Sequence, residues 1–211
     1  MERYDIMNEI IDKYNLQTYL EIGVRNPWEC FDRINCPIKM SVDPGVESET
    51  NYATYPYYSD DFFKKLENEE LNLPKDCKWD LIFIDGLHLA DQSYRDFTNS
   101  FRHISENGFV VFHDTNPPTI YHAREDYEDH STPIGGWWNG TVWKSIQKIR
   151  TNFDLDVITV DSDWGVTVVR NKRNFIYLSE DINPFYEYNT FSKFRKEILN
   201  LKNIEEFKLW V

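Results

Sequence analysis

Two clusters of acidic and histidine residues each follow a short apolar run of the chain. Asp85 and His88 follow the run LIFI, and His113 and Asp114 follow the run FVVF. Asp85 and Asp114 could hold a divalent cation, because Mg²⁺ and Mn²⁺ prefer oxygen ligands. A histidine would then remain as a base, since a neutral imidazole can take a proton from a hydroxyl near neutral pH. The alternative is that Asp85 caps a turn and His88 is merely exposed, but the same chemistry at two places favours a site.

The segment between the clusters predicts how they meet. Tyr94, Phe97, Phe101 and Ile104 recur at helical spacing, so residues 79–118 are predicted to form a strand, a helix and a second strand. Such a unit gives two parallel strands joined by a right-handed crossover. Both clusters then lie at the carboxyl ends of these strands, where open α/β sheets bind ligands.

A second unit of strand, turn and helix lies upstream. The segment TYLEIGVRNPWEC predicts a strand over residues 18–22, a turn at Gly23 and a helix that begins near Pro27. The next predicted strand ends at Asp43, 20 positions after Gly23, which is close to the spacing of a ribose-binding acid in nucleotide-binding folds. Glu21 could accept hydrogen bonds from a bound amino group, although a plain strand and turn would also explain it.

The remaining elements are predicted from periodicity and capping residues. Residues 3–14 describe a short amphipathic helix that covers the fold and takes no part in a site. Ser59, Asp60 and Asp61 are placed to cap a helix that begins with FFKKL, and Thr141 is placed to cap a later helix. The segments FDLDVITVD and WGVTVVRN predict an antiparallel pair of strands that closes one edge of the sheet.

A long loop over residues 115–140 carries the aromatic residues Trp137 and Trp138. Loops of this length in compact domains are usually functional lids or disordered, and the tryptophan pair disfavours disorder. Trp137, Trp138 and Trp143 could wall a substrate pocket, because their flat faces stack on sugar or aromatic rings. The alternative interpretation places these residues in the core.

Composition restricts the class of protein and of partner. The 211 residues suffice for one domain with a sizeable core. A net charge of -13 and a pI near 4.8 argue against nucleic acid as a partner, because binding to phosphates needs basic residues. The three cysteines suggest neither a disulfide framework nor a zinc site, and no apolar run reaches the length of a membrane span. We therefore expect a soluble, cytoplasmic protein.

The last part of the chain, residues 172–211, is predicted to be a helical extension of the domain formed by residues 1–171. One helical face of this extension carries Phe191, Phe194, Ile198 and Leu201. The extension could serve as a lid, as a contact in a homo-oligomer, or as a joint to another domain of a longer chain.

Four successive segments, LEIGV, SVDP, FIDGLHLADQSYRDF and ENGFVVFHDT, resemble the motifs of class I S-adenosylmethionine-dependent methyltransferases. The most specific of them is the D-G-x-H turn from Asp85 to His88, followed by a second strand that ends in an acid. Within this superfamily the chain is similar to the metal-dependent branch that contains catechol and sugar O-methyltransferases. The resemblance implies a Rossmann-like, doubly wound α/β fold, with a mostly parallel seven-stranded sheet and an antiparallel edge hairpin.

The resemblance also implies roles for individual residues. His88 matches the general base of antibiotic-sugar O-methyltransferases, and it would act with Asp85 and Asp114. Mg²⁺ or Mn²⁺ would be bound by Asp85, His113 and Asp114, with His113 standing where the sugar-modifying enzymes have a second acid. The residues expected to contact S-adenosylmethionine are Glu21, Gly23, Asp43, Ser59 and Asp85, and those expected to contact the substrate are Trp137, Trp138 and Asn139.

The predicted function is therefore the transfer of a methyl group from S-adenosylmethionine to a hydroxyl of a sugar or glycan. A catechol-like small molecule is the alternative acceptor, and a non-catalytic binding module on the same scaffold is the alternative class. A nucleotide-binding oxidoreductase would share Asp43 but should show the pattern G-x-G-x-x-G, which the sequence lacks.

Overall fold

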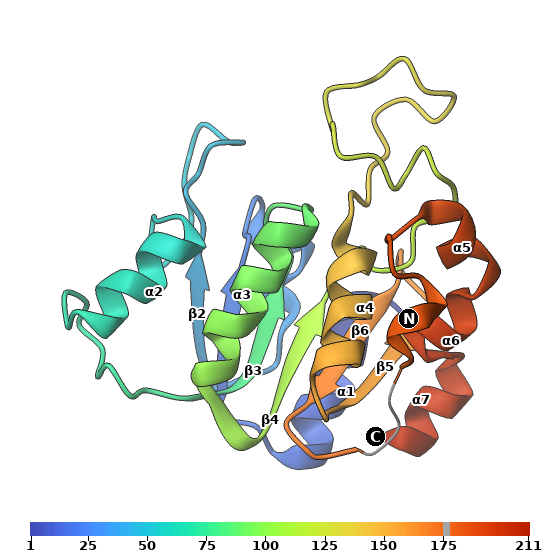
Figure 1. Ribbon diagram of the computed structural model, residues 1–211. Helices are drawn as coiled ribbons and strands as arrows, with labels where there is room; N and C mark the ends of the chain where they lie inside the picture. The colour runs from blue at the N-terminus through green and yellow to red at the C-terminus, as the bar shows by residue number, and fades with distance from the viewer. Residues whose placement is uncertain (175–177) are drawn as a thin grey trace.

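The apolar runs of the sequence become strands of one seven-stranded sheet in the computed structural model, which describes residues 1–174 and 178–211 (Figure 1). The strand order is β2-β1-β3-β4-β6-β5-β7. The bounds are β1 (Thr18–Ile22), β2 (Ile38–Val42), β3 (Trp79–Ile84), β4 (Ile104–Phe112), β5 (Asp156–Val160), β6 (Val166–Arg170) and β7 (Leu201–Lys202).

The sheet is mostly parallel, as predicted. The strands β2, β1, β3 and β4 pair in parallel, and β6 pairs antiparallel with both β4 and β5. The Rossmann-like class and the antiparallel hairpin are thus confirmed. The hairpin does not close the edge of the sheet, however, because β7 pairs in parallel with β5 and lies outside it.

Helices cover both faces of the sheet, with α2, α3 and α4 in front of it in Figure 1 and α1 behind it. Each face has its own apolar core, one under α2 to α6 and one under α1 and α7. Burial on both sides explains why the strands are apolar runs without polar alternation. The bounds are α1 (Arg3–Tyr14), α2 (Ser59–Glu67), α3 (Ala90–Arg102), α4 (Val142–Asn152), α5 (Tyr188–Lys193), α6 (Arg195–Leu199) and α7 (Ile204–Trp210), with 3₁₀ turns η1 (Pro27–Glu29), η2 (Phe31–Arg33) and η3 (Glu180–Ile182).

Three local predictions need correction. The helix expected at Pro27 is only the pair of 3₁₀ turns η1 and η2. Tyr58 and not Ser59 is the N-cap of α2. Thr141 is the N-cap residue of α4, as predicted, but its hydroxyl caps no amide of that helix, because it accepts the Ala90 N–H at 2.8 Å instead.

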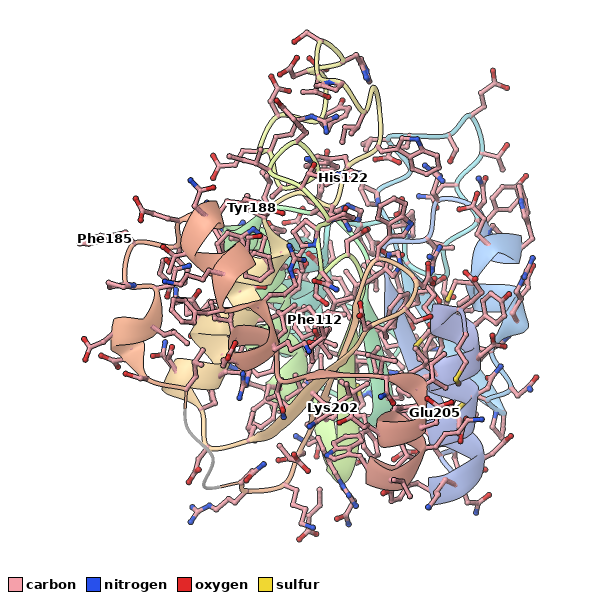
Figure 2. All side chains as sticks on the ribbon, turned by 90° about the vertical axis from the view of Figure 1, so that its right-hand side faces the viewer. Phe112, His122, Phe185, Tyr188, Lys202 and Glu205 are labelled. Atoms are coloured by element: carbon pink, nitrogen blue, oxygen red, sulfur yellow. The ribbon has the colours of Figure 1, made fainter. Side chains whose placement is uncertain are left out.

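The predicted helical face of the extension is interrupted, because Leu201 lies in β7 and not in a helix. The helix α7 that follows lies beside α1, as the position of Glu205 in Figure 2 shows, whereas Tyr188 of α5 lies across the sheet from it. Among the described residues, no helix combines the length and apolarity needed to cross a membrane.

Candidate active site

The two predicted clusters meet at the carboxyl ends of β3 and β4. Ile84 and Phe112 are register partners, so the residues that follow them emerge side by side. The Nδ1 atom of His113 lies 3.0 Å from Asp114 Oδ2 and 3.3 Å from Asp85 Oδ1. His88 completes the group, with its Nε2 at 3.3 Å from Asp85 Oδ1 and its Nδ1 at 3.3 Å from Asp114 Oδ2. We call these four residues the carboxylate–histidine cluster.

Backbone and ring contacts hold His88 in this cluster. Its carbonyl accepts the Thr141 N–H at 2.8 Å, and the ring of Trp138 stacks on its imidazole with centroids 5.1 Å apart. Gly140 sits against the same carbonyl, and a Cβ added there would lie 1.9 Å from it. The end of the long loop therefore fixes His88 through the residues directly before α4.

Two further residues join the cluster from distant parts of the chain. Arg3 NH1 lies 3.0 Å from His113 Nε2, and Arg3 Nε lies 3.7 Å from Asp85 Oδ2. Asp163, in the turn between β5 and β6, lies 3.3 Å from both Arg3 NH1 and His113 Nε2. The prediction that helix 3–14 has no part in a site is therefore wrong. A charged residue at one end of an apolar helix was the only signal in the sequence that could have pointed to Arg3.

Electrostatics tie these groups together. Burial would lower the pKa of His113, but Asp85 and Asp114 outweigh it and hold this pKa well above its ordinary value. Burial also opposes the charge on Asp85, yet His113, His88 and Arg3 keep the pKa of Asp85 well below its usual range. The pKa of His88 is raised in spite of burial, chiefly by the charge of Asp114. Asp85, His113 and Arg3 thus carry opposite charges that stabilise one another, and the neighbouring carboxylates make the imidazole of His88 a stronger base.

Three buried polar atoms around the cluster have no hydrogen-bond partner among the described residues. They are Arg3 Nε, His88 Nδ1 and Asn139 Oδ1. Asn139 is 1% exposed, and its Nδ2 donates to Asp114 Oδ1 at 2.7 Å. Unpartnered buried groups are costly, so donors and acceptors gathered at one place are typical of a site that binds a polar group.

The donor set also allows a divalent cation. One ligand atom each from Asp85, His113 and Asp114 lies within 4.8 Å of the others, and two carboxylates with an imidazole suit Mn²⁺ and similar ions. Asp163 could then accept the Nε2–H of His113, the arrangement by which carboxylates orient metal-binding histidines. Arg3 already lies against the same carboxylates, however, and a bound cation would face its positive charge.

The residues predicted to bind the cofactor lie at the ends of the neighbouring strands β1 and β2. Gly23 packs directly on β3, since a Cβ there would lie 2.3 Å from the carbonyl oxygen of Asp85. Asp43 accepts the Val24 N–H at 2.9 Å and the Gly45 N–H at 2.6 Å, which fixes its carboxylate beside the turn after β1. Glu21 is 3% exposed, and burial raises its pKa to about 8 although Tyr19 donates a hydrogen bond to it.

The fourth residue predicted for the cofactor has other partners. The Ser59 hydroxyl donates to Asp96 Oδ1 at 2.6 Å and accepts from Gln92 Nε2 at 3.2 Å, where α2 meets α3. The described contacts do not bring Ser59 to the carboxylate–histidine cluster, so its role in cofactor binding stays a prediction.

The three tryptophans that were predicted to wall a substrate pocket lie in different places. Trp138 covers His88, and Trp137 is 64% exposed and stacks on Trp164 with centroids 5.6 Å apart. Trp143 is 1% exposed and stacks on Phe191 in the core, so its proposed place in a pocket wall is wrong. The loop that carries the first two rises above the carboxyl ends of the strands in Figure 1, and Figure 2 shows His122 of this loop above Phe112 of β4.

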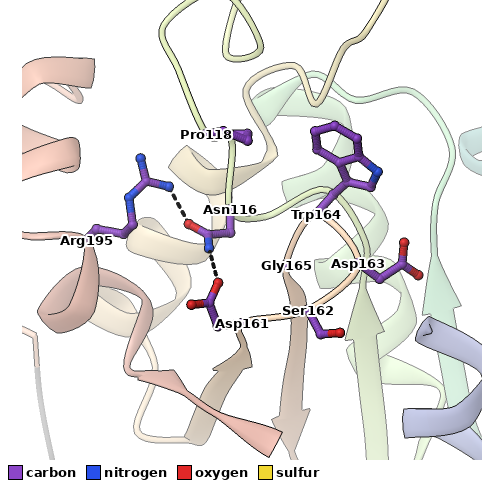
Figure 3. A pocket seen from close by; sticks show the side chains of 8 residues that line it. All are labelled: Asn116, Pro118, Asp161, Ser162, Asp163, Trp164, Gly165 and Arg195. Atoms are coloured by element: carbon purple, nitrogen blue, oxygen red, sulfur yellow. Dashed lines mark hydrogen bonds between the residues drawn. The ribbon is translucent and has the colours of Figure 1, made fainter. Parts of the chain in front are cut away.

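A cavity of about 310 Å³ adjoins the cluster at Asp163, which lines the cavity and lies 3.3 Å from His113 Nε2 (Figure 3). Residues 162–165 form one wall, and Arg195 lies opposite them. Arg195 donates to Asn116, which in turn donates to Asp161 at 2.9 Å. The cavity therefore offers an indole face, carboxylates and a guanidinium next to the reactive groups.

Comparison with known proteins agrees with this geometry. Residues 43–115 match a family model described as a methyltransferase domain. The matched segment contains all four residues of the carboxylate–histidine cluster together with Asp43. No curated protein matches the sequence.

Solved structures of O-methyltransferases share the fold of the chain. A candidate caffeoyl-CoA O-methyltransferase from Staphylococcus aureus is 16% identical, with 80% of this chain and 82% of that chain covered and a TM-score of 0.53. An O-methyltransferase from Bacillus cereus in complex with SAH is 11% identical, with 80% of each chain covered and a TM-score of 0.53. The family match and the shared fold confirm the predicted resemblance to class I methyltransferases.

Proposed function

We propose that the protein is an S-adenosylmethionine-dependent O-methyltransferase that methylates a hydroxyl of a sugar or glycan. The observation that carries the proposal is the position of His88 and two carboxylates at the ends of β3 and β4, beside the ends of β1 and β2. A cofactor across β1 and β2 would present its methyl group toward this cluster. The O-methyltransferase that shares the fold and contains SAH supports the same cofactor here.

The cofactor half of the site would be formed by Glu21, Gly23 and Asp43. Asp43 keeps lone pairs free beside its two backbone hydrogen bonds, so it can accept both hydroxyls of a ribose. Glu21 would meet the amino group of the cofactor, and Asp85 and Ser59 would complete the contacts. S-adenosylmethionine supplies an already activated methyl group, so the protein contributes mainly orientation.

In the reaction, His88 would take the proton of the acceptor hydroxyl while the oxygen attacks the methyl carbon in line with the departing sulfur. The C–S bond breaks as the C–O bond forms, and the products are a methyl ether, S-adenosylhomocysteine and a protonated His88. Asp85 and Asp114 flank the imidazole at 3.3 Å and would stabilise its positive charge. Asp85, His113 and Asp114 are the residues that would hold a divalent cation, which would orient the acceptor hydroxyls, but the guanidinium of Arg3 lies 3.7 Å from Asp85 and would compete with such an ion.

A sugar acceptor is favoured by the surroundings of the cavity. Asp163 and Trp164 both have left-handed backbone conformations, with φ of 46° and 63°. Such a conformation costs about 1 to 3 kcal/mol per residue and persists mainly at functional positions. It directs Asp163 to the cluster and the indole of Trp164, which lines the cavity, to the ring of Trp137. Indole faces with carboxylates and amides beside them suit sugar rings with hydroxyls, and Trp138 and Asn139 would contact the ring near His88.

Cofactor binding is tested by calorimetry with S-adenosylmethionine. We expect the wild-type protein to bind, and Asp43→Asn to bind at least tenfold more weakly because one ribose acceptor is lost. Asp32→Asn, in the 3₁₀ turn η2, is the matched control. Absence of binding at millimolar S-adenosylmethionine would refute the proposed enzymatic function and favour the alternative, a non-catalytic binding module.

The acceptor is tested by transfer of a labelled methyl group to a panel of sugars, glycans and catechols. Methylation of a saccharide hydroxyl is the expected result, whereas methylation of catechols alone would replace the sugar with the alternative acceptor.

The role of His88 is tested with His88→Ala. Removal of a general base should lower turnover by about 100-fold or more, with the affinity for S-adenosylmethionine unchanged. His130→Ala, which removes an exposed histidine of the loop over residues 115–140, should behave as the wild type. Unchanged turnover of His88→Ala at pH 7 would show that the base is wrongly assigned.

A further inference from the structure

Arg3 is placed in the carboxylate–histidine cluster by a rigid element. Its backbone N–H donates to Asp163 Oδ2 at 2.8 Å, and its guanidinium lies 3.3 Å from the same oxygen. The helix α1 that it begins is anchored in the core by Ile6, Met7 and Ile10, which are fully buried. The guanidinium is therefore fixed between the ends of β3 and β4 and the turn between β5 and β6.

The guanidinium of Arg3 lies against Asp85, a carboxylate that a metal ion in this site would also need. Asp85 and Asp163 flank the guanidinium, and His113 Nε2 lies 3.0 Å from it. The Arg3 side chain is 19% exposed, so water screens these charges incompletely. A divalent ion on Asp85 would have to share this carboxylate with Arg3 and would be repelled by it.

The guanidinium also retains an unused donor. Arg3 Nε is buried without a hydrogen-bond partner among the described residues, and at 3.7 Å from Asp85 Oδ2 it is too distant for a hydrogen bond. An oxygen that entered beside Asp85 could accept this N–H. A cation that carries a free donor can orient a hydroxyl oxygen next to a base, which is the task of a metal ion in such a site.

We propose that Arg3 is the resident cation of this active site. It neutralises Asp85 and Asp163, keeps the affinity of the cluster for Mg²⁺ and Mn²⁺ low, and offers its Nε–H to the acceptor hydroxyl. The role toward the acceptor rests on the proposed methyl transfer, whereas the effect on metal affinity does not depend on it.

The experiment is a calorimetric titration of the 211-residue protein with MnCl₂. We expect Arg3→Gln to bind Mn²⁺ at least tenfold more tightly than the wild type, because the carboxylates lose their counter-charge. Arg3→Lys keeps the charge and should bind as weakly as the wild type. Arg102→Gln, which removes an exposed arginine of α3 that pairs with Glu67 of α2, should also leave Mn²⁺ binding unchanged.

Two further variants keep the proposal open to refutation. Arg3→Met removes the same charge and retains an apolar stem, so it serves if Arg3→Gln does not fold. Asp85→Asn combined with Arg3→Gln should abolish the gained affinity, since the gain is assigned to this carboxylate. The proposal would be overturned if Arg3→Gln and Arg3→Met both bound Mn²⁺ no more tightly than the wild type.

Turnover gives a second and separate readout. Wild-type methyl transfer should be insensitive to EDTA, and Mn²⁺ should restore part of the activity lost in Arg3→Gln. Stimulation of the wild type by Mn²⁺ to the same extent would contradict the role of Arg3 toward the acceptor. If the protein does not bind S-adenosylmethionine, the proposed function fails while the calorimetric test of Arg3 still stands.

Discussion

At the scale of single residues, Asp96 shows how a buried charge connects stability to pH. Its carboxylate is 1% exposed and accepts hydrogen bonds from Ser59 and Gln92. Burial raises the pKa of Asp96 from 3.8 to about 6. Below pH 3.8 the group is protonated in both the folded and the unfolded protein, and above pH 6 it is ionised in both. The folded state therefore loses stability as pH rises through about 6.

We predict that Asp96→Asn removes this loss, because the amide keeps one acceptor oxygen and carries no charge. The shift corresponds to about 3 kcal/mol at most, so the variant should exceed the wild type by about 1 to 3 kcal/mol at pH 7.5. At pH 4.5 the advantage should fall to about a third of that value. Urea unfolding at both pH values checks this, with the exposed Asp91→Asn on the same helix as control. An equal difference at both pH values would contradict it.

At the scale of elements, the loop before α4 positions His88 through a close backbone contact. Gly140 has a φ of 65°, and an added Cβ would meet the His88 carbonyl oxygen at 1.9 Å. We expect Gly140→Ala to displace His88 and to reduce turnover at least tenfold, with little change in the affinity for S-adenosylmethionine. Steady-state kinetics and calorimetry measure the two effects.

Gly135 in the same loop provides the matched control. It has a φ of 59° but nothing within 4 Å of an added Cβ. Gly135→Ala should therefore cost only about 1 kcal/mol for placing alanine in a left-handed backbone conformation. It should cause no steric clash with a neighbouring residue. If both variants lost activity equally, the contact with His88 would not be what matters.

At the scale of the whole molecule, the C-terminal segment takes part in the main sheet and core. The strand β7 pairs with β5, and Phe207 of α7 is fully buried in the same apolar core as α1. The Tyr14 hydroxyl donates to the backbone oxygen of Val211 at 3.0 Å. These contacts support the prediction that residues 172–211 extend the domain formed by residues 1–171.

We predict that Phe207→Ala lowers the free energy of unfolding by about 3 to 5 kcal/mol, the usual cost of removing a buried aromatic ring. Unfolding should remain a single transition when followed by circular dichroism and by tryptophan fluorescence. Leu209→Ala on the same helix should change stability by less than about 0.5 kcal/mol, because Leu209 is 88% exposed. Two separate transitions in either protein would show that the segment folds independently.

Residues 79–118 show how much of the site could be predicted from the sequence. The runs LIFI and FVVF with helical spacing between them define two strands and a crossover. Because the ends of such parallel strands must meet, Asp85, His88 and Asp114 were expected to come together, and they do. Gly23 was expected at a tight turn, and the structure adds that its missing Cβ lets β1 pack on Asp85.

Local patterns by themselves thus determined the α/β class, the parallel strands and the meeting of the two clusters, because periodicity and strand ends are properties of neighbouring residues. Only the tertiary structure decided that Arg3 and Asp163 belong to the cluster, since they lie 160 positions apart and no local pattern links them. It also decided that Trp143 is core while Trp138 covers His88. The helix α1 and the hairpin of β5 and β6 come from distant parts of the chain. Their packing against the sheet brings the positive charge of Arg3 into the cluster.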